Sequence, residues 1–172
     1  MRLSADFKYL LLDTCIIEYW LDEDLNPSIT TLISKWGDSS TLPAVSDISY
    51  AELIRGAHRE KVQRVKDLLG GFTNLEVSQR ILAGSGVLQN IYKAQNPQTN
   101  GASVEDMVIA TASFIHELPI ITADVGDFPH PFFTQEKKEN IIFTKKGRDR
   151  MVSIAMLVPD LPALKYWDKQ TN

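Results

Sequence analysis

Residues 9–13 read Tyr-Leu-Leu-Leu-Asp, a short apolar run that ends at a carboxylate. A continuous run of this kind predicts a buried strand. Asp13 stands where the strand ends, and an unpaired carboxylate there is costly unless something compensates its charge. Residues 14–22 have apolar side chains at helical spacing, so Asp13 is either an ordinary N-cap of that helix or part of a functional site.

Strand-like and helix-like stretches alternate through most of the chain. Further helices are predicted at 26–36, 47–58, 60–69, 78–95 and 103–117, and further strands at 41–45, 73–77, 119–122, 141–144 and 152–158. The breaker-rich stretch 96–101 is predicted as a loop, and 129–140 as a larger one. This order predicts an α/β protein, a three-layer α/β/α sandwich with a mostly parallel sheet. Ligand sites in such sheets lie at the carboxyl ends of strands.

The composition predicts an ordinary globular protein. A chain of 172 residues, 44% hydrophobic and 23% charged, is expected to form one domain, residues 1–172. No apolar run reaches the roughly 18 residues that a membrane span requires, so no membrane partner is expected. The N-terminus shows no secretory signal, and Cys15 is the single cysteine, which fits a cytoplasmic location.

Four acids fall at strand ends or helix starts of the predicted sheet: Asp13, Glu52, Asp106 and Asp124. Each has an ordinary explanation of its own. Asp13 suits an N-cap, Glu52 a surface ion pair with Arg55, Asp106 a capping box, and Asp124 a turn. As a set, they fall where the loops of one sheet converge, which favours a shared site.

Such a cluster predicts a metal centre. Neighbouring carboxylates repel one another, and hard divalent cations relieve that repulsion. Oxygen ligands favour Mg²⁺ or Mn²⁺. Zinc is not expected, because Cys15, His58, His116 and His130 are scattered without ligand spacing. The net charge of −4 argues against a nucleic-acid partner only if the carboxylates hold no cations.

Four segments, in order, carry a resemblance to a known family: LLLDTC (10–15), SYAELIRGA (49–57), DMVIATAS (106–113) and IITADVGDF (120–128). With these segments the chain resembles the PIN-domain nucleases, in particular the VapC-type toxin of VapBC toxin–antitoxin pairs. The resemblance spans roughly residues 8–144, and leaves a C-terminal extension from about 145.

The resemblance implies a PIN-like fold and a metal-dependent endoribonuclease that leaves a 3′-hydroxyl and a 5′-phosphate. It implies that Asp13, Glu52, Asp106 and Asp124 surround the metal, with Asp127 as an alternative or additional ligand. Thr14 matches a hydroxyl residue that is common beside the first Asp. An antitoxin protein and a second copy of the chain are the implied partners, beside the RNA substrate.

Basic residues after Glu52 are candidates for RNA binding, above all Arg55, Arg59 and Lys61. A second basic run comprises Lys145, Lys146, Arg148 and Arg150. Solvated surface positions are the alternative for each of them. The apolar stripe within 14–36 is predicted either to join an interface or to be buried internally.

Two other functions compete with that of a nuclease. A PIN-like module that binds RNA or a partner without cutting is the main alternative to a nuclease. An aspartyl-phosphate phosphohydrolase would also place Asp13 at the end of a first strand. That chemistry generally needs a second acid two residues later, where this chain has Cys15.

Overall fold

The computed structural model describes residues 7–95 and 102–171, so the predicted loop 96–101 lies outside the described residues. The elements, in chain order, are β1 (Tyr9–Leu12), α1 (Thr14–Leu21), α2 (Asn26–Trp36), β2 (Leu42–Ser46), α3 (Asp47–Gly56), η1 (Arg59–Lys61), α4 (Val62–Leu69), β3 (Thr73–Leu75), α5 (Gln79–Gln95), α6 (Val104–His116), β4 (Ile120–Thr122), η2 (Val125–Asp127), β5 (Phe133–Lys145), β6 (Arg148–Pro159) and α7 (Leu161–Thr171). Each predicted helix and strand has a counterpart among them; α7 was not predicted.

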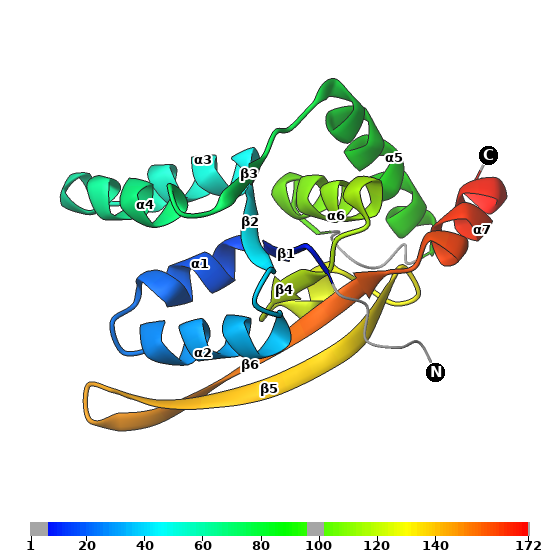
Figure 1. Ribbon diagram of the computed structural model, residues 1–172. Helices are drawn as coiled ribbons and strands as arrows, with labels where there is room; N and C mark the ends of the chain where they lie inside the picture. Colours follow the sequence, from blue (N-terminus) through cyan, green and yellow to red (C-terminus); the bar gives the residue numbers. More distant parts are fainter. Residues whose placement is uncertain (1–6, 96–101, 172) are drawn as a thin grey trace.

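The strands form one six-stranded sheet in the order β3-β2-β1-β4-β6-β5. The first four run parallel, whereas β6 is antiparallel to β4, and β5 is antiparallel to β6. Helices lie on both sides of the sheet (Figure 1). The predicted α/β sandwich with a mostly parallel sheet is confirmed. Because the parallel strands β1 and β4 are neighbours, the residues that follow them are brought together at one edge.

The two faces of the sheet bury separate sets of side chains, as the alternation of a strand requires. In β1, Leu11 packs with the helices α5 and α6. Leu10 and Leu12 point the other way and pack with α1 and α2. Asp13 comes two residues after Leu11, so the same alternation directs it toward the α6 side.

Polar side chains cap the two helices that carry acids of interest. The hydroxyl of Ser46 accepts a hydrogen bond from the backbone N–H of Ile48 at the start of α3. Ser103 caps α6, and Asp106 completes a capping box with it. Both starts agree with the sequence, because Ser is a preferred N-cap residue.

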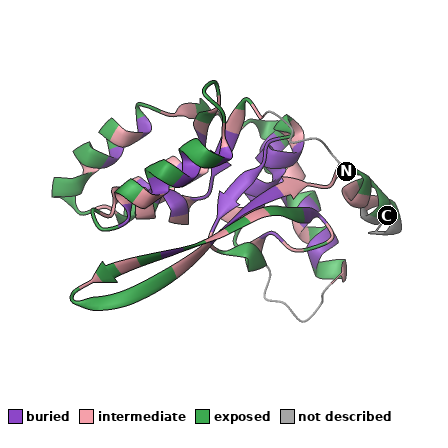
Figure 2. Cartoon of the chain, turned by 60° about the horizontal axis from the view of Figure 1, so that its bottom comes forward, coloured by how far each residue is buried: buried purple, intermediate pink, exposed green. Residues whose placement is uncertain are grey.

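The segment 129–140 is not the large loop that was predicted. Residues 133–140 are the first half of β5, which forms a long hairpin with β6 (Figure 2). The sequence Gln-Glu-Lys-Lys-Glu-Asn lacks apolar alternation because most of this strand is exposed, and backbone pairing with β6 forms the strand. Much of the segment after Lys145 is likewise β6, between β4 and β5.

The apolar stripe within 14–36 lies mostly inside the protein. The buried members are Ile16, Ile17, Ile29, Leu32, Ile33 and Trp36. For these six residues the second alternative, burial inside the protein, is the one observed. No helix in residues 7–95 and 102–171 combines the length and hydropathy needed to cross a membrane.

Candidate metal centre

Asp13 lies at the end of β1 and is held by three donors. Its Oδ1 accepts a hydrogen bond from the Thr14 backbone N–H at 2.7 Å. Its Oδ2 accepts from the hydroxyl of Thr122 at 2.6 Å and from the thiol of Cys15 at 3.2 Å. Asp13 is thus the N-cap of α1 and, at the same time, a buried carboxylate with a fixed orientation.

Asp124 joins Asp13 because β4 runs beside β1. The backbone N–H of Asp13 donates to the carbonyl of Ile121 at 3.0 Å, which aligns the two strand ends. The backbone N–H of Asp124 donates to the hydroxyl of Thr122 at 2.9 Å. Potential ligand atoms of Asp13, Cys15 and Asp124 all lie within 4.8 Å of one another, close enough to share one ion.

Asp106 approaches this edge from the first turn of α6. Its Oδ2 accepts hydrogen bonds from the backbone N–H and the hydroxyl of Ser103, at 2.8 and 2.6 Å. The ordinary capping role that the sequence allowed is therefore real. The same carboxylate is also near enough to Asp13 and Asp127 for its charge to raise the pKa of both.

Two acids of the cluster, Asp13 and Asp127, have raised pKa values. Burial raises the pKa of Asp127 to about 6, and repulsion from Asp106, Asp124 and Asp13 adds to the rise. The pKa of Asp13 is also raised, chiefly by burial and further by Asp106, although hydrogen bonds from Thr122, Cys15 and Thr14 oppose the rise. A cation placed between these groups would reverse their mutual repulsion.

Glu52 is connected to the cluster through Thr14. The hydroxyl of Thr14 donates to Glu52 Oε2 at 2.7 Å, and the backbone N–H of Thr14 donates to Oδ1 of Asp13. Arg55 lies 3.6 Å from Glu52 Oε1 and 3.6 Å from Glu105 Oε1, so it bridges α3 and α6. The arrangement places a guanidinium at the rim of the acidic site.

The predicted residues do not all come together. The structure brings Asp13, Asp106, Asp124 and Asp127 into one electrostatic cluster, with Thr14, Glu52 and Arg55 attached to it. Arg59 and Lys61 are exposed on η1, and within the described residues neither pairs with a carboxylate of this cluster. Lys61 instead lines a hollow beside the end of α1.

Two residues of the site were missed in the sequence. Cys15 had been dismissed because its spacing from the histidines suits no zinc site, but its thiol contacts Asp13 directly. Burial and the charge of Asp13 raise the pKa of this thiol, so it remains protonated and can donate. Thr122 is buried and contacts Asp13 across 109 positions of sequence. Its position at the end of an apolar strand was the feature of the sequence that could have identified Thr122 as part of the site.

The donor set fits a hard divalent cation. The converging groups are carboxylates from β1, α6 and the segment after β4, and carboxylate oxygens are the ligands that Mg²⁺ and Mn²⁺ prefer. The pKa of Asp13 and that of Asp127 are raised, first by burial and then by neighbouring carboxylates, and a bound cation would favour the charged form of both. The residues present therefore fit the metal that the resemblance implies.

Solved structures share this fold. No protein-family model matches the sequence, and no curated protein is similar to it. A chain of a toxin–antitoxin complex from Klebsiella pneumoniae is 25% identical; the match covers 71% of this chain and 92% of that one, with a TM-score of 0.56. VapBC2 from Rickettsia felis, bound to a DNA fragment from its promoter, is 19% identical. That match covers 72% of this chain and 93% of the other, with a TM-score of 0.54. FitAcB from Neisseria gonorrhoeae is 22% identical. That match covers 69% of this chain and 90% of the other, with a TM-score of 0.54.

These matches define the class of protein. The chain has a PIN-like α/β fold, the fold of components of toxin–antitoxin complexes. The predicted resemblance to toxin–antitoxin proteins is confirmed by the 25% identical chain, and for VapBC2 the likeness is one of fold. The matched chains are almost fully covered, whereas more than a quarter of this chain has no counterpart in them.

Proposed function

We propose that this protein is a divalent-metal-dependent endoribonuclease, the toxin of a toxin–antitoxin pair. One observation carries the proposal. Asp13, Asp106, Asp124 and Asp127 gather at the carboxyl edge of the sheet with raised pKa values for two of them. A protein without a metal-dependent activity has little reason to maintain that repulsion, because it lowers the stability of the fold.

The chain's own residues have distinct roles in this proposal. Asp13 and Asp106 hold the cation directly, since Asp13 is fixed by three donors and Asp106 by its capping box. Asp124 and Asp127 complete the ligand set or orient water. Mg²⁺ or Mn²⁺ supplies the Lewis acid that activates water and neutralises the charge growing on the phosphate.

Two further residues act at the rim. Glu52 accepts a hydrogen bond from the hydroxyl of Thr14 at 2.7 Å, and its proposed role is to orient water or the ion. The side chain of Arg55 is 72% exposed and reaches Glu52, so its guanidinium can turn to an RNA phosphate without losing a buried contact. Arg59 and Lys61, on η1 beyond the end of α3, are proposed to bind RNA farther from the acidic cluster.

The partner of the chain is proposed to be an antitoxin protein. The matched structure from Klebsiella pneumoniae is described as a toxin–antitoxin complex, and the match covers 71% of this chain. A homodimer is proposed from the family resemblance. The non-catalytic alternative is a PIN-like module that binds RNA or a partner without cutting.

Cleavage of a labelled RNA in the presence of Mg²⁺, Mn²⁺ or EDTA tests the nuclease proposal. We expect Asp13→Asn and Asp106→Asn to lower the cleavage rate by about 100-fold or more, because each removes a proposed metal ligand. Asp67→Asn, a change of the same kind at an exposed position of α4, is the matched control and should retain the parent rate.

Two outcomes would contradict the proposal. Full activity in both ligand variants would contradict the assignment of the site. Cleavage that persists in EDTA would contradict the role of the metal. A thermal shift with Mn²⁺ separates the two functions, since an occupied site stabilises the fold. No shift together with no cleavage would favour the non-catalytic module.

A further inference from the structure

The β5–β6 hairpin projects past the edge of the sheet that carries the acids. β4 pairs only with Ala155 to Leu157 of β6, and Thr122, the last residue of β4, is opposite Ala155. The seven residues Arg148–Ile154 and their partners in β5 therefore form a two-stranded arm beyond the carboxyl end of β4. At 3.3 Å per residue the arm extends about 20 Å.

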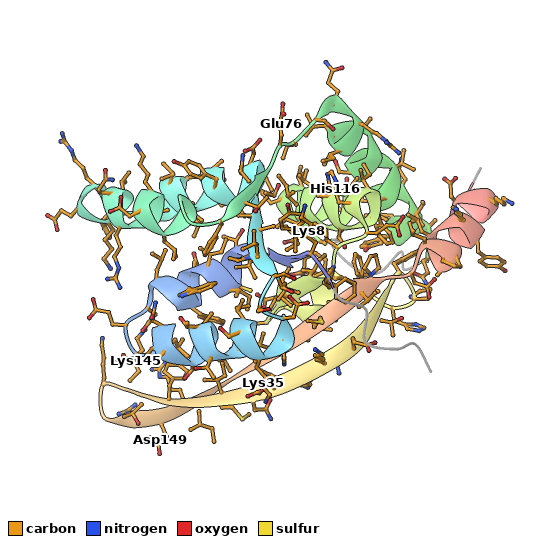
Figure 3. The ribbon with its side chains drawn as sticks, viewed as in Figure 1. Lys8, Lys35, Glu76, His116, Lys145 and Asp149 are labelled. Atoms are coloured by element: carbon orange, nitrogen blue, oxygen red, sulfur yellow. The ribbon has the colours of Figure 1, made fainter. Side chains whose placement is uncertain are left out.

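The arm is anchored rather than free. An isolated two-stranded hairpin is marginally stable in water. Here the inner face of the arm packs on the same core as α1 and α2, through Ile141, Phe143, Val152 and Ile154. Lys35 of α2 pairs with Glu139 at 2.7 Å, and Lys145 donates to Asp22 at the end of α1. These contacts tie the arm to α1 and α2 (Figure 3 labels Lys35 and Lys145).

The tip of the arm, residues 145–150, has no role in the core. It reads Lys-Lys-Gly-Arg-Asp-Arg and turns at Lys146 and Gly147, both with positive φ. Four basic residues against one acid give the tip a charge of +3, which leaves −7 on the rest of the chain. Among the described residues Lys146, Arg148 and Arg150 are exposed and have no ion-pair partner.

Basic side chains also lie between the acidic cluster and the tip, and several of them are paired with acids: Arg55 with Glu52 and Glu105, Arg64 with Glu23, and Lys145 with Asp22. α1 begins beside Asp13 and ends at Leu21, about 12 Å away along its axis. Arg55 lies at the acidic end of this path. Lys61 and Arg64 line a hollow of about 260 Å³ beside the end of α1, where Lys145 is bonded to Asp22. At 3.4 Å per stacked nucleotide, 12 Å corresponds to about three or four nucleotides.

We propose that the tip of the β5–β6 arm, residues 145–150, binds through Lys146, Arg148 and Arg150 the phosphate backbone of an RNA strand whose scissile phosphate lies at the acidic cluster. This inference rests on the proposed ribonuclease function. A body with a charge of −7 repels RNA, so the tip supplies a local field of the opposite sign. The contact is with the backbone and is independent of base sequence, as lysine and arginine contacts to phosphate are.

Direct RNA binding without divalent ions tests the inference. The probe is a fluorescein-labelled oligouridylate of 20 nucleotides, titrated with the full chain in EDTA at several NaCl concentrations. We expect Arg148→Gln/Arg150→Gln to weaken binding by about 25-fold at 0.1 M salt, because each lost phosphate contact costs about fivefold. The slope of log K against log salt should fall by about 1.4. Arg80→Gln/Lys93→Gln, two exposed changes on α5, is the matched control and should bind like the parent.

The possible results separate this inference from the nuclease proposal. Parent-like affinity and salt slope in the arm variant would overturn the inference, as would an equal loss in the α5 control. Weakened binding of an acidic, aspartate- and glutamate-rich peptide with unchanged RNA binding would assign the tip to a protein partner instead. A parent that binds but never cleaves RNA would contradict only the nuclease proposal, because binding in EDTA needs no catalysis.

Discussion

Removal of the charge of Asp127 is expected to have opposite effects on stability without and with metal. The pKa of this carboxyl is raised from 3.8 to about 6 by burial and by Asp106, Asp124 and Asp13. For a raised acid pKa, the folded state binds more protons between the two values, so stability falls as pH rises from about 4 to 6 and stays low above 6. Asp127→Asn abolishes that fall.

The magnitude follows from the pKa. A rise from 3.8 to about 6 corresponds to about 3 kcal/mol without solvent screening. Because Asp127 is only half-buried, screening reduces this to about 1 kcal/mol. For a chain of 172 residues that is a gain of about 2–4 °C in Tm. We therefore expect metal-free Asp127→Asn to melt 2–4 °C above the parent at pH 7.5 and at the same temperature near pH 3.5.

Manganese should reverse the order. At 100 times the parent's Kd, Mn²⁺ stabilises the parent by about 2.7 kcal/mol. Loss of a ligand weakens affinity by about 10- to 100-fold, so the same Mn²⁺ concentration stabilises the variant by only about 0.4–1.4 kcal/mol. The assay is differential scanning fluorimetry at both pH values, with Asp24→Asn as an exposed control. A metal-free Tm below that of the parent, or equal Mn²⁺ shifts in both proteins, would refute the role of Asp127.

Three further changes test other parts of the structure. Thr122→Val removes the donor to Asp13 and should cost about 1–3 kcal/mol in urea unfolding and about tenfold in Mn²⁺ affinity by calorimetry. Ser103→Ala removes the cap of α6 and should lower the free energy of unfolding by about 1 kcal/mol. Ile154→Ala empties a core position at the base of the arm and should cost about 2–5 kcal/mol in the same assay.

Each of these changes has an exposed counterpart. Thr134→Val, Ser39→Ala and Ile142→Ala should each stay within about 0.5 kcal/mol of the parent. Ile142 is the sharpest control, because it lies on the same arm as Ile154 but is 72% exposed. Equal costs at the two isoleucines would contradict the burial assigned to the arm, and unchanged Mn²⁺ affinity in Thr122→Val would contradict the role of Thr122 in positioning Asp13.

Local patterns in the sequence were sufficient for the elements near the site. The apolar run before Asp13 predicts β1, and Ser46 and Ser103 predict the starts of α3 and α6, because strand burial and helix capping depend on residues a few positions apart. The alternation of strands and helices also predicts that Asp13 and Asp124 meet, since parallel strands end at one edge. The hairpin was missed in part because backbone pairing leaves no apolar pattern on an exposed strand.

Tertiary structure alone decided how the site is assembled. Thr122 and Cys15 hold the same oxygen of Asp13, although Thr122 is 109 residues away from it, and no local pattern encodes such a contact. Asp127 joins the cluster electrostatically, because the charges of Asp106, Asp124 and Asp13 act on it through space rather than along the chain. The run Tyr-Leu-Leu-Leu-Asp therefore predicted a strand and a candidate carboxylate, and the packing of β4 and α6 beside it determined which side chains surround that carboxylate.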